Sequence, residues 1–198
     1  MPYSTMSYSR HDDYPSHVRE RASRVRLACF DVDGTLTDGC LLFDNEGREL
    51  KAFHVHDGLG LVLLRKAGIE VAFITARAST IAERRAAELG LTEVHTAVAD
   101  KLARVGEIAA RLGIGMDEVS FMGDDLPDLR VMSQVGFSVA PASAHPWVRE
   151  RVHWRTATAA GHGAARELCD LLLAAQGRVE SLLEDVTRVE GVRVEGNA

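Results

Sequence analysis

Short apolar runs alternate with longer amphipathic segments through most of the chain, and this alternation constrains the fold more than any other feature of the sequence. Apolar runs of this length predict buried strands, and the amphipathic segments predict helices. Strands are expected at 26–30, 69–75, 93–98, 119–125 and 137–140, and helices at 57–68, 79–90, 101–112, 128–136 and 163–177. Strands that alternate with helices form a mostly parallel sheet covered on both faces. The sequence therefore predicts an α/β, Rossmann-like fold.

A β-hairpin is expected between the first strand and the first helix. Residues 40–55 hold two strand-like pieces around the sequence NEG, which is typical of a turn. Only 23 positions separate Asp33 from His56, and the same number separates Lys101 from Asp124. Neither interval can hold a capping domain, because independently stable domains rarely fall below about 40 residues. We therefore expect an open site, which self-association through the hairpin would cover.

Composition limits which binding partners and which cellular compartment are expected. The formal net charge is −6 and no basic run is long, so neither nucleic acid nor an anionic membrane is an expected partner. The three cysteines form no paired framework, which is typical of reduced thiols and predicts a cytoplasmic protein. No stretch of the sequence has the pattern of a secretory signal or a membrane span.

The two ends of the chain differ in composition from its middle. Residues 1–24 are rich in Tyr, Ser, His and Arg and predict a flexible extension. Residues 178–198 carry several acidic side chains and predict a mostly solvated tail. A single domain is therefore expected over residues 25–177.

Polar side chains follow several of the expected strands, at the points where those strands end. These residues are Asp31 and Asp33, then Thr75, then Lys101, and then Asp124 with Asp125. The carboxyl ends of parallel strands meet at one edge of a sheet, where ligands of such folds bind. The sequence therefore predicts one site that gathers these side chains.

The residue types at this predicted site suit phosphoryl transfer. A carboxylate held at a strand end, such as Asp31, can act as a nucleophile. A second acid, Asp33, can protonate a leaving oxygen and later accept a proton from water. Thr75 offers a hydroxyl donor and Lys101 a positive charge, while the carboxylate oxygens favour Mg²⁺ as the bound cation. The cations would offset the charge of a phosphate monoester beside the acids.

Four motifs, "DVDGTLTDG", "ITAR", "DK" and "GDDLPD", occur in the order and spacing of the haloacid dehalogenase superfamily of phosphatases, which the chain resembles from about residue 26 to 175. The resemblance implies a capless member in which Asp31 becomes an aspartyl-phosphate and Asp33 is the acid and base. It implies that Thr75 and Lys101 bind the phosphoryl group. It also implies a Mg²⁺ site formed by Asp31, by Asp124 and by the backbone carbonyl of Asp33. Asp125 and Asp128 are expected beside these ligands rather than in direct contact with the ion.

Longer segments, including "DGCLLFDNEGRELKAFHVHDGLGL" and "GHGAARELCDLLL", resemble the 3-deoxy-D-manno-octulosonate 8-phosphate phosphatases. This resemblance implies a small phosphorylated sugar acid as substrate, a role in lipopolysaccharide precursor synthesis, and a homotetramer in which hairpins pack together. His56 and Ala160 stand where that family commonly has Arg and Gly. The 9-phosphate of a nonulosonic (sialic-type) acid therefore stays open as an alternative substrate.

Four further residues are candidates for binding the sugar acid: Arg77, Arg84, His56 and Arg166. The arginines can hold the carboxylate of such a substrate. Each has a structural alternative. Arg77 and Arg84 could lie on a solvated helix face, and His56 could be a packing or surface residue. Arg166 could form an ion pair with Glu167 or with a neighbour. Two other functions also stay open for the whole chain, a phospho-receiver signalling module and an inactive scaffold. The acid at Asp33, the hairpin and the intact set of polar residues favour an enzyme.

Overall fold

The computed structural model describes residues 14–187, and within this range a six-stranded sheet has the order β5-β4-β1-β6-β7-β8. All of its strand pairs are parallel. The strands are β1 (Leu27–Phe30), β4 (Glu70–Ile74), β5 (Glu93–His95), β6 (Val119–Met122), β7 (Phe137–Ala140) and β8 (Trp154–Arg155). The predicted α/β fold with a mostly parallel sheet is confirmed.

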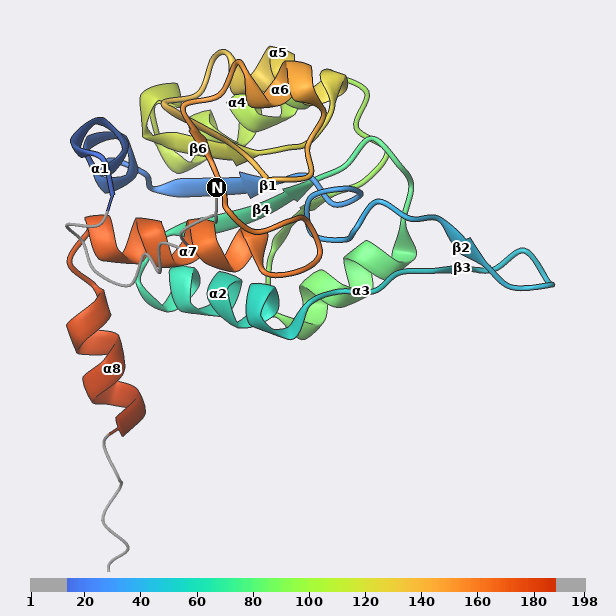
Figure 1. Ribbon diagram of the computed structural model, residues 1–198, viewed down its shortest axis with the longest axis horizontal. Coiled ribbons are helices and arrows are strands. Elements are labelled where there is room, and N and C mark those ends of the chain that lie inside the picture. Colours follow the sequence, from blue (N-terminus) through green and yellow to red (C-terminus); the bar gives the residue numbers. More distant parts are fainter. Residues whose placement is uncertain (1–13, 188–198) are drawn as a thin grey trace, which may run out of the picture.

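Helices cover both faces of this sheet (Figure 1). One layer contains α2 (Val55–Lys66), α3 (Thr80–Glu88) and α7 (Ala164–Ala175), and the other contains α4 (Lys101–Leu112), α5 (Leu129–Met132) and α6 (Pro146–Arg149). Side chains of β1 alternate between the two layers, with Ala28 and Phe30 in one core and Leu27 and Cys29 in the other. A strand that is buried on both faces has to be apolar throughout, which explains the uninterrupted apolar run.

Capping residues set where two helices begin. The side chain of Ser79 accepts a hydrogen bond from the backbone N of Ala82 at 3.2 Å, and Asp100 accepts one from Ala103 at 3.0 Å. Caps of this kind typically contribute about 1 kcal/mol of stability. The cap at Asp100 fixes Lys101 as the first residue of α4. A catalytic candidate is therefore positioned by the start of a helix.

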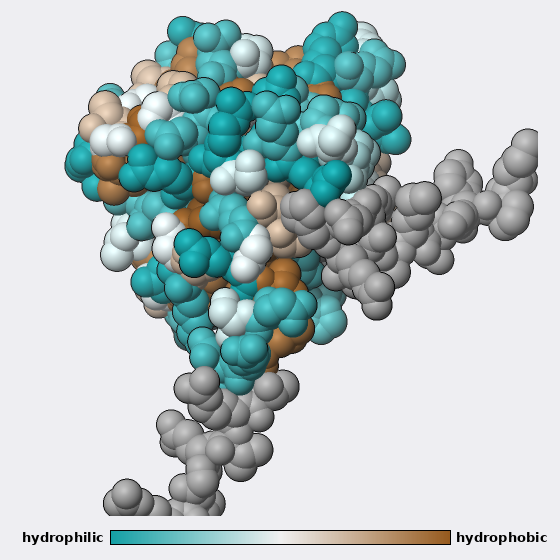
Figure 2. Space-filling view, turned by 90° about the vertical axis from the view of Figure 1, so that its left-hand side faces the viewer, coloured by the Kyte–Doolittle hydropathy of each residue, from teal (hydrophilic) through white to brown (hydrophobic). Residues whose placement is uncertain are grey.

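The predicted hairpin is confirmed, and it projects from the end of the sheet where β1 and β4 terminate (Figure 1). It consists of β2 (Leu42–Phe43) and β3 (Glu49–Leu50), which pair in an antiparallel arrangement. Leu42, Phe43 and Leu50 are all more than half exposed. Figure 2 shows a different face, on the side of α1 (Ser16–Ser23), where hydrophilic residues predominate and hydrophobic ones form only small separate areas. The hairpin therefore carries several of the exposed large hydrophobic side chains of residues 14–187.

The structure differs from the sequence prediction near the N-terminal end of the chain. Residues 14–24 of the predicted flexible extension include α1, which packs against α7 and buries Val18 and Ala22, and Tyr14 just before the helix is buried as well. Val18 and Ala22 are four residues apart, so the helix has one narrow apolar face. Residues 1–13 and 188–198 lie outside the described range. The first part of the predicted solvated tail is helix α8 (Val179–Thr187).

Other local elements also differ from the predictions. The helix expected at 128–136 is only α5, preceded by a 3₁₀ turn at Leu126–Asp128, and a second 3₁₀ turn lies at Met116–Glu118. The structure adds α6 and β8, which the sequence analysis did not predict. Between residues 14 and 187, no helix has both the length and the apolar character that crossing a membrane requires.

Candidate active site

Asp31 is the first residue after β1 and lies at the centre of the sheet's carboxyl edge. Its backbone N donates to the carbonyl oxygen of Met122 at 2.9 Å, which continues the ladder between β1 and β6. Its side chain is buried. The two central strands therefore hold this carboxylate rigidly.

Lys101 brings a positive charge to Asp31. Its Nζ donates to Oδ1 of Asp31 and to Oδ1 of Asp128, each at 2.6 Å. Burial alone would lower the pKa of this lysine, but Asp31 and Asp128 outweigh that effect and raise it. The lysine therefore stays charged and offsets part of the negative charge around it.

Three carboxylates meet beside this lysine. Asp31, Asp124 and Asp128 each offer an oxygen atom, and these atoms lie within 4.8 Å of one another. Thr35 donates its hydroxyl to Oδ1 of Asp124 at 3.1 Å, and the backbone N of Asp124 donates to Oδ2 of Asp128 at 3.1 Å. Burial and then the charge of Asp128 raise the pKa of Asp31 to about 7 and that of Asp124 to about 6.

Crowded carboxylates with raised pKa values fit a divalent cation. A bound positive charge would stabilise the ionised form of each carboxylate, and an all-oxygen set of ligands suits a hard ion such as Mg²⁺. Gly34 leaves the space that the set needs, since a Cβ at this position would collide with the carboxylate of Asp124. Its φ of +87° is also unfavourable for residues other than glycine.

Asp33 lies next to this cluster but its side chain contacts a different lysine. Nζ of Lys51 donates to Oδ1 of Asp33 and, at 3.1 Å, to Oε1 of Glu49. Oδ2 of Asp33 is buried and has no hydrogen-bond partner among residues 14–187. Sequence reasoning missed Lys51, although it follows the hairpin strand and is one of only three lysines in the chain.

Thr75 follows β4 and is buried at the same edge of the sheet. Its backbone N donates to the carbonyl oxygen of His95, and its carbonyl oxygen accepts from Val98, both at 3.0 Å. Its Oγ1 accepts a hydrogen bond from the backbone N of Arg77 at 3.3 Å. The loops after β4 and β5 therefore fix the position of this hydroxyl.

Comparison with known proteins identifies the family. Residues 89–168 match the model of the haloacid dehalogenase-like hydrolases. The chain is 45% identical to the 3-deoxy-D-manno-octulosonate 8-phosphate phosphatase of Yersinia pestis over 163 residues, which is 82% of this chain and 87% of that protein. The chain belongs to this family of haloacid dehalogenase-like phosphatases.

Solved structures show that this phosphatase shares its fold with close relatives. A hypothetical protein from Xanthomonas campestris is 53% identical with a TM-score of 0.87, over 95% of this chain and 100% of that one. The enzyme of the same family from Moraxella catarrhalis, in complex with magnesium, phosphate and KDO, is 36% identical with a TM-score of 0.85, over 88% and 100% of the two chains. That relative therefore holds a magnesium ion together with phosphate and KDO.

The candidates for sugar binding lie in different surroundings in this phosphatase. Arg77 donates to Oε1 of Glu49 at 2.8 Å, beside Lys51. Arg84 is largely exposed and pairs with Glu88 at 3.5 Å on its own helix. The structure therefore brings Arg77 into the network around Asp33, while Arg84 contacts an acid on its own helix.

His56 and Arg166 lie on helices α2 and α7, which pack against each other. His56 is exposed, and its ring meets that of His54 edge-on with 5.1 Å between centroids. Arg166 pairs through Nε with Asp170 at 2.7 Å, and its backbone N donates to Oδ1 of Asp57 at 2.7 Å. The ion pair weighed for Arg166 therefore forms with Asp170, and the roles of both residues in substrate binding stay predictions.

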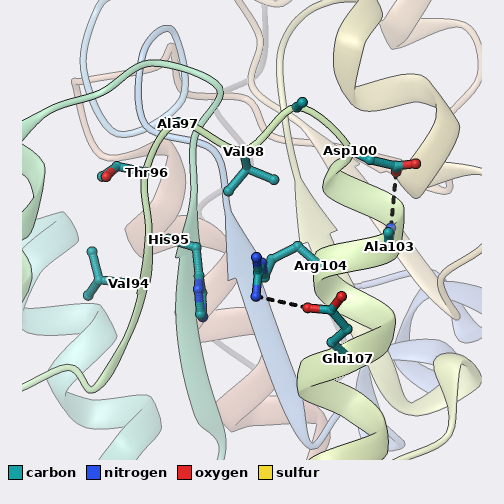
Figure 3. A pocket seen from close by; sticks show the side chains of 10 residues that line it. Val94, His95, Thr96, Ala97, Val98, Asp100, Ala103, Arg104 and Glu107 are labelled. Atoms are coloured by element: carbon teal, nitrogen blue, oxygen red, sulfur yellow. Dashed lines mark hydrogen bonds and ion pairs between the residues drawn. The ribbon is translucent and has the colours of Figure 1, made fainter.

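A depression of about 420 Å³ lies between β5 and α4 in this phosphatase (Figure 3). Its lining includes His95, Asp100 and Arg104, and Arg104 pairs with Glu107 at 2.8 Å. Asp31, Asp124 and Asp128 are not among the lining residues. The depression is therefore separate from the carboxylate cluster, although Asp100 directly precedes Lys101.

Proposed function

We propose that this chain is a Mg²⁺-dependent phosphatase that hydrolyses 3-deoxy-D-manno-octulosonate 8-phosphate through an aspartyl-phosphate at Asp31, as a step of lipopolysaccharide precursor synthesis. The observation that carries the proposal is the group formed by the buried Asp31, Lys101 and Asp128 and the partly buried Asp124 at the carboxyl edge of the sheet. The names of the relatives support the sugar acid as substrate.

The first half of the proposed reaction transfers the phosphoryl group to the protein. A carboxylate oxygen of Asp31 attacks the phosphorus, and the bond from phosphorus to the sugar oxygen breaks. Asp33 gives its proton to the departing sugar oxygen, so the free sugar acid leaves as an alcohol. Lys101 stays beside Asp31 and offsets the negative charge of the phosphoryl oxygens.

The second half restores the protein. Asp33, now a carboxylate, accepts a proton from water, and the water oxygen attacks the phosphorus of the aspartyl-phosphate. The bond from phosphorus to the Asp31 oxygen breaks, inorganic phosphate leaves, and Asp31 is again a carboxylate. Thr75 is positioned to donate its hydroxyl to a phosphoryl oxygen in both halves.

Asp31, Asp124 and the backbone carbonyl of Asp33 would hold the Mg²⁺. The ion would supply positive charge where a dianionic substrate meets several carboxylates. Asp128 would position Lys101 and the backbone of Asp124, because it accepts hydrogen bonds from both.

The proposal includes a homotetramer built on the hairpin. Leu42, Phe43 and Leu50 expose hydrophobic surface on two short strands, and an isolated two-stranded hairpin is only marginally stable. Packing against hairpins of other copies would bury these side chains. It would also place a second chain near the open edge of the sheet.

Release of phosphate from a panel of substrates tests the proposed function. The panel contains 3-deoxy-D-manno-octulosonate 8-phosphate, a nonulosonic acid 9-phosphate and a hexose phosphate, each with and without Mg²⁺. We expect the highest kcat/KM on the first substrate, loss of turnover on chelation, and loss of turnover in Asp31→Asn. Equal activity on the hexose phosphate, or a preference of about tenfold for the 9-phosphate, which is about 1.4 kcal/mol in transition-state binding, would overturn the substrate assignment.

A further inference from the structure

Lys51 connects the hairpin to the proposed acid and base. Its side chain is only 2% exposed, and its Nζ contacts Asp33 and Glu49. Lys66, by contrast, is exposed. A charged group without solvent is stable only when it is paired, so the two carboxylates are what allow an ammonium group at this place.

The two oxygens of Asp33 have different surroundings. Oδ1 accepts from Lys51, whereas Oδ2 is buried and has no hydrogen-bond partner within the described part of the chain. A carboxyl group that donates a proton and then takes one back needs one oxygen that is held and one that faces the reactants. The contacts of Asp33 hold one oxygen and leave the other without a partner, which is compatible with this requirement.

We propose that Lys51 is a positioning residue for the reaction. It holds Oδ1 of Asp33, so that Oδ2 is the atom that gives a proton to the leaving sugar oxygen and later accepts one from water. This inference rests on the proposed function, and it adds a residue outside the strand-end motifs to those proposed to support the reaction.

The position of Lys51 depends on two other segments. Glu49 on β3 accepts from Lys51 at 3.1 Å and from Arg77 at 2.8 Å. Arg77 in turn donates through its backbone N to Thr75. Anionic and cationic side chains therefore alternate along a row of contacts from Asp33 through Lys51 and Glu49 to Arg77, which lies in the loop after β4. The orientation of Asp33 is linked in this way to the hairpin and to Thr75.

The leaving group of the substrate distinguishes positioning from a merely structural role. A sugar phosphate releases an alkoxide and needs the proton from Asp33, whereas p-nitrophenyl phosphate releases a stable phenolate and does not. The parameter kcat/KM reports the steps up to departure of this group. A defect in positioning Asp33 therefore lowers kcat/KM on the sugar phosphate far more than on p-nitrophenyl phosphate.

The experiment measures kcat/KM on both substrates for the full-length parent, Lys51→Met, Lys51→Gln and Lys51→Arg. We expect Lys51→Met to lose at least about 30-fold on the sugar phosphate and less than about threefold on p-nitrophenyl phosphate. Lys51→Arg keeps the charge and should stay within about threefold of the parent on both. Lys66→Met, which changes the exposed lysine, should match the parent.

The outcomes separate this inference from the proposed function. Equal losses on the two substrates, or no loss on either, overturn the role of Lys51 while the phosphatase assignment stands. A parent protein with no phosphatase activity overturns both. Circular dichroism confirms the fold of each variant. If Lys51→Met does not fold, Lys51→Gln carries the test, with an expected loss of about tenfold confined to the sugar phosphate.

Discussion

Nζ of Lys101 lies 2.6 Å from Oδ1 of Asp31, although 70 positions separate the two residues in the chain. Lys101→Met would leave Asp31 and Asp128 buried without their shared cation. Removing one partner of a buried ion pair typically costs about 3–5 kcal/mol of unfolding free energy. We expect a loss of this size in urea unfolding of the metal-free protein, and Lys66→Met should show none. A Lys101→Met protein as stable as the parent would contradict the account of this contact.

The affinity for Mg²⁺ should depend on pH between about 8 and about 5.5. The pKa of Asp31 is raised to about 7 and that of Asp124 to about 6, so both carboxyl groups take up protons as the pH falls through this range. Protonated ligands bind the ion poorly. Titration calorimetry should therefore show binding that is at least about tenfold weaker at the lower pH, with protons released on binding. Equal affinity at both pH values would remove these two carboxylates from the ligand set.

The same shifts predict the pH dependence of stability without metal. Asp31 and Asp124 bind protons more tightly in the folded state than in the unfolded state, because their folded pKa values are raised. Their contribution to the unfolding free energy is therefore highest below about pH 4 and falls as the pH rises through about 7. Urea unfolding of Asp31→Asn should show a weaker fall over this range than the parent shows. An identical fall in both proteins would contradict the assignment to Asp31.

Gly161 lies against the loop that follows Asp33, and substitution there should be costly. A Cβ at this position would come 2.5 Å from the backbone N of Asp38, and the φ of Gly161 is +69°. We expect Gly161→Ala to lose about 2–3 kcal/mol of unfolding free energy and to lower activity. Gly68→Ala is the matched control, because its φ is +84° but nothing lies within 4 Å of the added atom. Equal losses in the two variants would show that backbone strain alone decides the effect.

Charged substitutions on the hairpin should disrupt the proposed tetramer. Phe43→Asp places a charge on an exposed hydrophobic side chain, where burial against another copy would be unfavourable. Light scattering should give four times the chain mass for the parent and a smaller mass for the variant. Trp147→Ser, an exposed residue on α6, should keep the mass of the parent. A parent that is already a monomer would refute the proposed assembly.

Much of the fold and the site could be predicted from the sequence, and the exceptions have physical reasons. The strand ends that carry Asp31, Thr75 and Asp124 follow continuous apolar runs, which are a strong local signal. Lys51 follows a strand of two residues, and its burial depends on how the hairpin folds back onto Asp33. That contact is tertiary, so no local pattern indicates it.

Other differences arise in the same way. Asp128 reaches the carboxylate cluster because a 3₁₀ turn at Leu126–Asp128 brings it back toward Asp124. Helix α1 buries only two apolar side chains, Val18 and Ala22, with Tyr14 buried just before it, and the polar residues between these positions dominate the local composition. Its place in the core comes from packing against α7.

The most direct test of the central claim is chemical capture of the aspartyl-phosphate. The protein is mixed with substrate and Mg²⁺, quenched with acid at early times, and reduced with borohydride, which converts an acyl phosphate of aspartate to homoserine. Digestion with trypsin, which cleaves after Arg26 and Arg48, releases the segment 27–48. This segment contains both Asp31 and Asp33, and fragmentation in a mass spectrometer distinguishes them. We predict homoserine at position 31, in an amount that increases in Asp33→Asn, where hydrolysis of the intermediate is slowed. Turnover without homoserine at any time, or with homoserine at position 33, would contradict the proposed mechanism.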